Sequence, residues 1–148
     1  IRMLTGRLHS LADQYREEFG VDVRDIPGSG AAGGIAGMLA ALGGRLMPGF
    51  DLVADELDLH DHVAAADLVI TGEGHLDAQS FEGKVVGGVA ELAAEAGVPV
   101  VAIAGQVFDD AGARIEAVSL VDRFGEERSV HDTVRCIEEV AAALLSRP

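Results

Sequence analysis

The chain has 148 residues, a length typical of one domain with a single core. Its formal net charge is −14, from 11 Lys and Arg against 25 Asp and Glu, so its surface repels nucleic-acid phosphates and anionic lipids. No run approaches the ~18 apolar residues that a membrane span needs. We therefore expect neither a nucleic-acid nor a membrane partner, and the single cysteine, Cys136, fits a cytoplasmic location.

The first part of the chain is predicted to be mostly helical. Apolar residues recur at intervals of three and four between Met3 and Phe19, which is the helical period, and Gly20 follows as a stop. A glycine-rich turn is expected over 28–34. Further helices are expected over 35–42, 49–57 and 59–66.

From Asp67 onward the pattern changes to alternating strands and helices. Two apolar runs, 67–71 and 98–104, predict buried strands of a parallel sheet. Helical periodicity separates them over 85–96, a third strand is expected over 115–121, and Ser129 and Asp132 predict the start of a last helix.

This order predicts an α/β fold with a parallel sheet flanked by helices, similar to Rossmann and flavodoxin-like folds. We therefore divide the chain into a mostly helical segment, 1–66, and an α/β part, 67–148.

The loop expected after the first strand is the strongest candidate site, because open parallel sheets bind ligands at the carboxyl ends of their strands. Gly72 and Gly74 would let backbone amides approach a ligand closely. Between and after them, Glu73 and Asp77 bring two carboxylates that could hold Mg²⁺.

Two basic side chains belong to the same region. Lys84 is the only lysine in the chain and is expected in the first turns of the next helix, where it would suit a phosphate or carboxylate. His75 is a candidate contact for an anion. A purely structural interpretation also stays open, in which Asp77 or Ser80 caps the helix and Lys84 is solvated. The flanking glycines and the single lysine favour a functional loop.

A second candidate site is the run Gly28-Ser29-Gly30-Ala31-Ala32-Gly33, which matches G-x-G-x-x-G. A dinucleotide site is a weak interpretation, because the charged segment before the run does not read as a buried strand. Two interpretations weigh equally here: a loop whose amides face an anion, and glycines that serve close packing. A nucleotide-binding oxidoreductase domain stays an alternative.

Taken together, these residues resemble the glycerate kinase family of the bacterial two-domain type. The run from Thr71 to Lys84 carries the pattern T-G-E-G-x-L-D-x-Q-S-x-x-G-K, which is long and specific. The matching stretches are 26–34, 46–50, 66–80, 83–84 and 97–105.

The resemblance implies a kinase that uses ATP and Mg²⁺ to phosphorylate a hydroxyl of D-glycerate, giving phosphoglycerate. It implies an active site in the cleft between two α/β domains. It also implies that this chain is the C-terminal portion, that the missing N-terminal part of the same protein is its partner, and that the chain alone is inactive. A non-catalytic truncated α/β module is a further alternative, and a homo-oligomer is compatible with the sequence.

The candidate site residues follow from the two loops and the resemblance together. We expect Lys84 and Asp77 to be catalytic, and Glu73 and Asp77 to bind the metal. His75 stands where the family pattern has arginine, and a neutral imidazole holds an anion less firmly than a guanidinium group does. Neither loop is assigned to ATP or to glycerate. The expected substrate- and phosphate-binding residues are Gly28, Ser29, Gly30, Gly33, Thr71, Gly72, Gly74, His75, Gln79 and Ser80.

Overall fold

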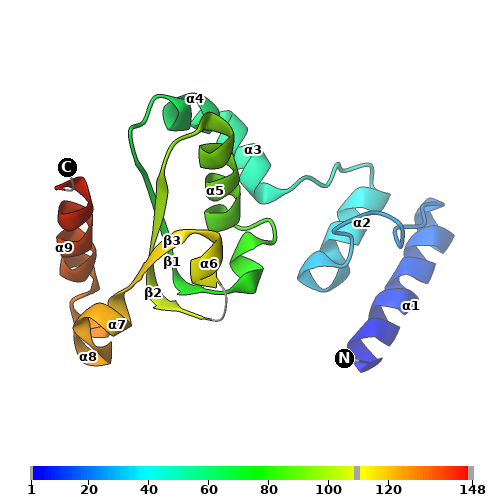
Figure 1. Cartoon of the computed structure of the whole chain (residues 1–148). Coiled ribbons are helices and arrows are strands. Elements are labelled where there is room, and N and C mark those ends of the chain that lie inside the picture. The colour runs from blue at the N-terminus through cyan, green and yellow to red at the C-terminus, as the bar shows by residue number, and fades with distance from the viewer. Residues whose placement is uncertain (1, 109–110, 147–148) are drawn as a thin grey trace. The chain divides into compact units, whose positions relative to one another are not determined.

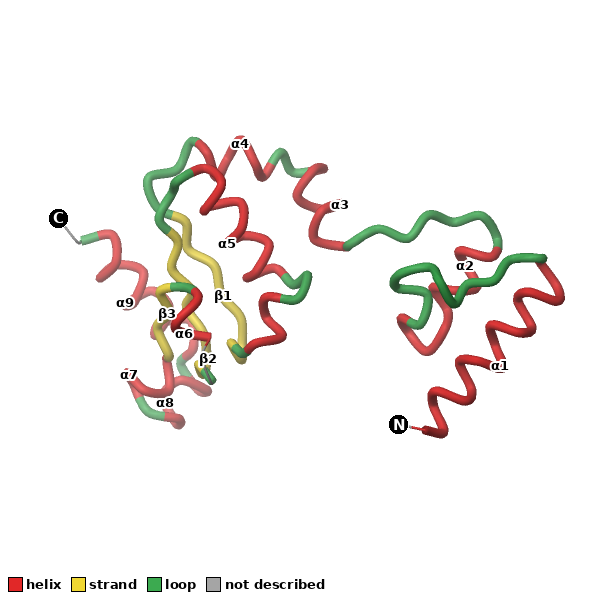
Figure 2. The backbone as a smooth tube through the Cα atoms, turned by 45° about the vertical axis from the view of Figure 1, so that its right-hand side comes forward, coloured by secondary structure: helices red, strands yellow, loops and turns green. Residues whose placement is uncertain are grey.

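The computed structural model describes residues 2–108 and 111–146. The chain divides into two compact units, Ile1–Met47 and Pro48–Pro148. Each unit has hydrophobic core clusters of its own. Figures 1 and 2 show the helices of the first unit and the sheet of the second.

The first unit is built from helices, as the periodicity predicts. Helix α1 (Arg2–Phe19) ends at Gly20, whose φ of +72° favours glycine. A short 3₁₀ turn, η1 (Ala31–Gly34), leads into α2 (Ile35–Ala41). Three buried residues, Ala12, Val23 and Ala41, form a small core between these elements.

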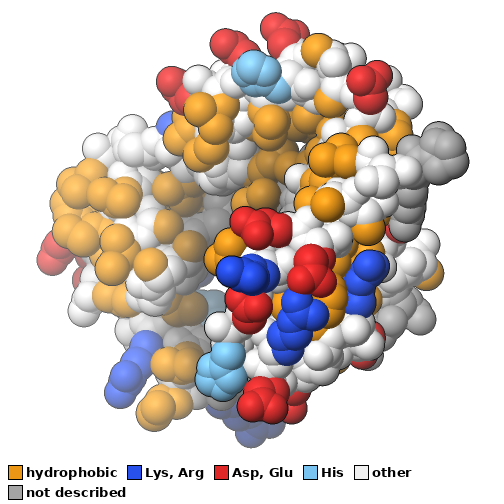
Figure 3. All heavy atoms as spheres, turned by 90° about the vertical axis from the view of Figure 1, so that its left-hand side faces the viewer, with side chains coloured by type: hydrophobic (Ala, Val, Ile, Leu, Met, Phe, Trp, Pro, Cys, Tyr) orange, Lys and Arg blue, Asp and Glu red, His pale blue; other side chains and the backbone are white. Residues whose placement is uncertain are grey.

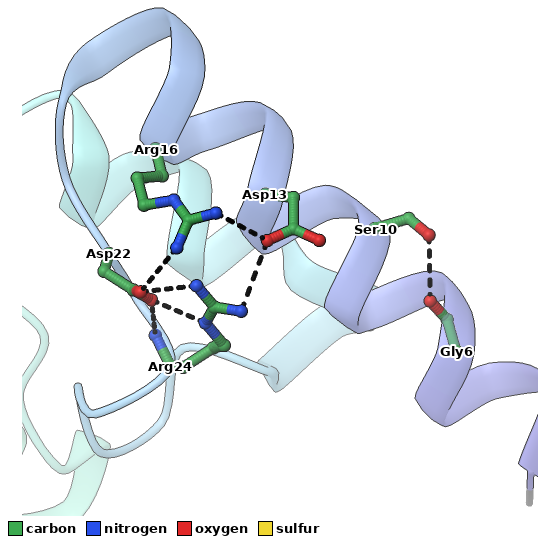
Figure 4. A network of polar contacts seen from close by, with 6 residues as sticks. All are labelled: Gly6, Ser10, Asp13, Arg16, Asp22 and Arg24. Atoms are coloured by element: carbon green, nitrogen blue, oxygen red, sulfur yellow. Dashed lines mark hydrogen bonds and ion pairs between the residues drawn. The ribbon is translucent and has the colours of Figure 1, made fainter.

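A network of exposed ion pairs ties the segment after α1 back to that helix (Figure 4). Arg24 pairs with both Asp22 and Asp13, and Arg16 lies 3.3 Å from Asp13. The hydrogen bonds from Arg24 lower the pKa of the Asp22 carboxyl to about 2. These contacts join residues 22 and 24 to the outer side of α1.

The second unit contains a three-stranded parallel sheet in the order β1-β2-β3, which confirms the predicted α/β class. The strands are β1 (Val69–Leu76), β2 (Val100–Val107) and β3 (Glu116–Ser119). Val69 pairs in register with Val100, and Val101 pairs with Glu116. Both apolar runs therefore pair in parallel. The prediction of burial is confirmed for β2 but is wrong for β1, which lies at an edge of the described sheet and leaves Ile70 exposed.

Helices cover both faces of this sheet (Figure 1). On one face, Val63 and Leu92 pack against Val69 and Val100. On the other face, Val101 and other apolar side chains of β2 pack against the apolar side of α9. Adjacent strand residues such as Val100 and Val101 serve opposite faces because side chains alternate along a strand. The helices are α3 (Gly49–Glu56), α4 (Leu59–Ala64), η2 (Ala78–Phe81), α5 (Val85–Ala96), α6 (Ala111–Arg114), α7 (Leu120–Phe124), α8 (Glu126–His131) and α9 (Thr133–Leu145).

Helix α9 also carries exposed apolar side chains. These are Val134, Ile137 and Leu145. Figure 3 views this side of the molecule and shows hydrophobic side chains intermixed with charged ones. Within the residues that the structure describes, no helix combines the length and the apolar character needed to cross a membrane.

The strand predicted over 67–71 extends further than expected. It continues as β1 through Leu76, so the first half of the predicted loop is strand. Pairing with β2 continues to His75 and Leu76, opposite Gln106 and Val107. The two glycines of this run do not end the strand, because β2 holds their backbone in extended conformation.

The last helix is divided, contrary to the prediction of one helix starting near Ser129. Asp132 leaves the helical conformation, with φ −134° and ψ 39°, and separates α8 from α9. The Ser129 hydroxyl caps neither helix and instead donates a hydrogen bond to the Gly125 carbonyl at 2.7 Å.

The boundary between the two units lies before residue 48, whereas the sequence placed it after residue 66. The difference consists of α3 and α4. Phe50, Leu59 and Val63 from this segment pack against Leu92 and Ala93 of α5, so apolar contacts attach both helices to the sheet unit.

Candidate active site

A pocket of about 370 Å³ lies beside β1 and the start of α5, in the second unit. Its polar side chains are Glu73 and Lys84, both expected site residues. The remaining lining residues are Phe50, Gly72, Gly83, Val85 and Val86. The structure therefore brings the carboxylate and the lysine of the T-G-E-G…G-K run to one place.

Glu73 projects toward the α5 face of the sheet. It pairs in register with Ala104, which belongs to the core cluster that also contains Val86 of α5. Its Oε1 atom is buried and has no hydrogen-bond partner among the described residues. A buried carboxylate oxygen without a donor is costly, so this oxygen is suited to receive a hydrogen-bond donor or a cation from a ligand.

Lys84 is the residue immediately before α5, with extended backbone angles of φ −96° and ψ 171°. The sequence analysis expected Lys84 inside the first turns of that helix, whereas the structure places it at the N-cap, just before the helix begins. Its side chain is exposed and makes no ion pair within the part of the chain that the structure describes. The first amides of α5 have no acceptor four residues earlier within the helix, so the Lys84 ammonium group lies beside the positive end of that helix.

Phe50 of α3 forms the apolar wall of the pocket, a role that the sequence analysis did not assign. Its ring packs directly on Gly88 of α5, where an added Cβ would lie 2.3 Å from a ring atom. The adjacent Gly87-Gly88 pair inside an apolar helix was the available signal, because glycine in a helix interior costs stability unless something packs there.

Asp77 is engaged by the turn that follows β1. Its Oδ1 accepts a hydrogen bond from the Gln79 amide at 2.8 Å, and its own amide donates to Ser80 Oγ at 3.0 Å. Ser80 is fully buried and its hydroxyl donates to the His75 carbonyl at 3.4 Å. Asp77 and Ser80 thus form a capping box, as the purely structural interpretation of this loop predicted. The capping box stands at the start of η2, however, and not at the start of α5.

The glycines of the motif approach protein backbone. A Cβ on Gly72 would lie 2.2 Å from the Ile103 carbonyl oxygen, and a Cβ on Gly105 would lie 2.6 Å from the Gly74 carbonyl oxygen. Close strand pairing therefore accounts for the absence of a side chain at Gly72. Thr71 is half-buried in the strand, and the exposed His75 ring lies 5.7 Å from the Phe108 ring.

Magnesium would have to use carboxylate oxygens from this motif. Among the described residues, no three Asp, Glu, His or Cys side chains are grouped so that they could hold a metal ion. The unpartnered Oε1 of Glu73 nevertheless fits a cation. Mg²⁺ commonly takes only one or two protein carboxylates and completes its shell with water and substrate phosphates, so the residues present are compatible with it.

The glycine-rich run of the first unit forms a separate feature. Gly28, Ala32, Gly33 and Gly34 all have positive φ. Ser29, Gly30 and Gly34 line a pocket of about 210 Å³ together with side chains of α1. No strand precedes the run, since residues 21–23 have no regular structure, so the dinucleotide fingerprint lacks the strand that it requires.

The sequence profile of the glycerate kinase family matches residues 1–147. The chain belongs to the glycerate kinase family. A glycerate kinase from Halalkalibacterium halodurans is 48% identical over 108 residues, which are 72% of this chain and 28% of that protein. A glycerate 2-kinase from Escherichia coli strain K12 is 44% identical over 110 residues, which are 74% of this chain and 29% of that protein.

A solved structure supports the fold of this glycerate kinase family member. A crystal structure assigned as glycerate kinase 2 from Salmonella typhimurium LT2 matches with a TM-score of 0.58 and 32% identity. The match covers 95% of this chain and 38% of that one. The chain thus spans well under half of the relatives that it resembles.

Proposed function

We propose that this chain is the C-terminal portion of a kinase that transfers the γ-phosphoryl group of ATP to a hydroxyl of D-glycerate, giving phosphoglycerate. Membership of the glycerate kinase family supports the reaction class. The observation that carries the proposal for this chain is the Glu73–Lys84 pocket. Among the residues that the structure describes, a buried oxygen of Glu73 lacks a hydrogen-bond partner and Lys84 forms no ion pair.

Phosphoryl transfer asks the protein mainly to position its substrates and to neutralise charge. The Lys84 ammonium offsets negative charge on the substrates, and the amides at the start of α5 add donors in the same place. Glu73 and Asp77 are the carboxylates proposed to contact Mg²⁺, which when bound neutralises the ATP phosphates. Phe50, Val85 and Val86 limit the access of water to the carboxylate.

The test is an assay of ADP release that depends on D-glycerate, run on the full-length protein. Glu73→Gln and Lys84→Met are expected to lower kcat/KM by about 10²-fold or more, the scale of losing one electrostatic contact in a transition state. Glu82→Gln is the matched control, since Glu82 is exposed and does not line the pocket. The 148-residue chain assayed alone is expected to be inactive.

Asp77 needs two variants because it also caps η2. Asp77→Asn keeps an N-cap acceptor and removes the charge, whereas Asp77→Ala removes both and should cost about 1 kcal/mol of stability. A drop in kcat/KM for Asp77→Asn at unchanged melting temperature supports a role through charge. Absence of glycerate-dependent ADP release by the unmodified full-length protein would refute the proposed function.

A further inference from the structure

The Glu73–Lys84 pocket carries two polar groups of opposite character. One is a buried hydrogen-bond acceptor, Glu73 Oε1, and the other is an exposed cation, the Lys84 ammonium group. Glu73 Oε1 has no donor among the described residues, and Lys84 has no anion. A ligand that satisfies both must present a hydrogen-bond donor at one end and a negative charge at the other. A hydroxy acid does so, because its hydroxyl donates and its carboxylate is anionic.

Charge opposes a polyphosphate in the same place. Where no metal ion lies between them, the several negative charges of a triphosphate would meet the charge of Glu73 at close range in a partly buried pocket. A monoanionic hydroxy acid needs one cation, which Lys84 supplies, and the positive end of α5 adds a favourable dipole for its carboxylate. The hydroxyl of the hydroxy acid then donates a hydrogen bond to Glu73 Oε1, so this oxygen stabilises the ligand instead of repelling a phosphate.

The walls of the pocket fit a small carbon skeleton. Phe50, Val85 and Val86 are apolar, and the volume of about 370 Å³ is near the lower limit for ligand pockets. The ring of Phe50 is held on Gly88, so this wall is set by packing between α3 and α5. The carbon chain of a short hydroxy acid can contact these walls while its two ends reach the polar groups.

We infer that this pocket holds the hydroxy-acid substrate and not the nucleotide: Glu73 Oε1 accepts a hydrogen bond from a substrate hydroxyl, and Lys84 pairs with the substrate carboxylate. This inference rests on the proposed function and assigns one of its two substrates to the pocket. Oε1, which would by itself also fit a cation, is assigned to the substrate hydroxyl, and the second carboxylate oxygen of Glu73 is left to the metal.

The experiment measures binding to the full-length protein by calorimetry, with D-glycerate and with a non-hydrolysable ATP analogue plus Mg²⁺. Glu73→Gln and Lys84→Met should each weaken D-glycerate binding about tenfold or more, as expected for a lost charge-assisted hydrogen bond. Lys84→Met should bind the ATP analogue within about twofold of the unmodified protein. Glu73→Gln is compared for D-glycerate alone, because the second oxygen of Glu73 is proposed to contact the Mg²⁺ that accompanies the analogue. Glu82→Gln should change neither affinity.

Propionate, which has the carboxylate but no hydroxyl, separates the two contacts as a competitor of glycerate. Lys84→Met should weaken its inhibition, whereas Glu73→Gln should leave it unchanged. Because Lys84 is exposed, its variant reports on binding even if Glu73→Gln perturbs the fold.

Two results would overturn the inference. One is weaker binding of the ATP analogue by Lys84→Met with unchanged glycerate binding, and the other is an equal loss for both ligands in that variant. Either result leaves the proposed function standing if the unmodified protein phosphorylates D-glycerate. An unmodified protein that releases no ADP with glycerate refutes the proposed function instead.

Discussion

Two carboxylates of the same motif have different environments. Glu73 Oε1 is buried and has no hydrogen-bond partner in the described part of the chain, whereas Asp77 accepts a hydrogen bond from the Gln79 amide. Ligand binding at Glu73 Oε1 is favourable, because a donor or cation from the ligand removes the free-energy cost of a buried oxygen without a hydrogen bond. Asp77 already stabilises the turn through its hydrogen bond. The effect of its charge must therefore be measured apart from its effect as a cap before it is assigned a role in binding.

The titration of the Asp22 carboxyl depends on one neighbouring side chain, that of Arg24. Because Arg24 lowers the pKa of Asp22 to about 2, we expect Arg24→Gln to return it toward its ordinary value of 3.8. A lowered pKa stabilises the fold above pH 3.8, and that contribution disappears as the pH falls through about 2. The measurement is a ¹³C NMR titration of the Asp22 carboxyl.

Arg7→Gln provides the control for this titration, since Arg7 is on α1 but outside the network in Figure 4. It should leave the pKa of Asp22 unchanged. An equal shift in both variants would show that the general positive charge of the unit, and not the contact with Arg24, sets the titration.

At the scale of elements, glycines determine how closely neighbouring backbones pack, because a glycine has no side chain. Gly72 lies against the Ile103 carbonyl of β2, and Gly88 lies against the Phe50 ring. Gly87 similarly faces the Phe81 backbone, where a Cβ would lie 2.7 Å from Cα. These positions bring β1, α3 and η2 close to their neighbours, which is how the pocket acquires its walls.

Gly72 and Gly74 are a matched pair for testing this packing. Gly72→Ala is expected to destabilise the chain by about 2 kcal/mol, because its Cβ would collide with backbone. Gly74→Ala should cost much less, since its own Cβ would meet nothing within 4 Å. Chemical denaturation of both variants measures the difference. Equal stabilities would show that β1 can move away from β2 without cost.

On the scale of the whole chain, the two units differ in the size of their cores. The first unit buries three hydrophobic residues in its core cluster, Ala12, Val23 and Ala41, whereas the sheet unit has buried side chains on both faces of the sheet. Small cores supply little stability on their own. The family relatives are much longer than this chain, which agrees with the proposal that further polypeptide belongs to the complete kinase.

The connection between the units should be the first site of tryptic cleavage. Residues 44–48 have no helix or strand, and Arg45 is exposed. We expect brief trypsin digestion to yield the fragments 1–45 and 46–148, identified by mass spectrometry. Arg45→Gln should remove this first cut. Initial cleavage at Arg7 or Arg16 would instead show that α1 opens before the connection is cut.

Much of the fold was predictable because local periodicity determines helices and buried strands. The spacing from Met3 to Phe19 predicted α1, and the apolar runs near Val69 and Val100 predicted two parallel strands. The motif from Thr71 to Lys84 identified the family and located the candidate pocket. The extent of β1 was not predictable, because glycines read as a loop unless a neighbouring strand holds them extended.

The sequence by itself determined the element order, the α/β class and the residues that could carry chemistry, since periodicity and residue type are local properties. Only the tertiary structure decided which of those residues face a pocket. It attached α3 and α4 to the sheet unit, placed the Phe50 ring on Gly88 and engaged Asp77 in a cap. It also left Glu73 Oε1 without a hydrogen-bond partner among the residues described. Burial and hydrogen-bond satisfaction depend on neighbours distant in sequence, so no local pattern contains them.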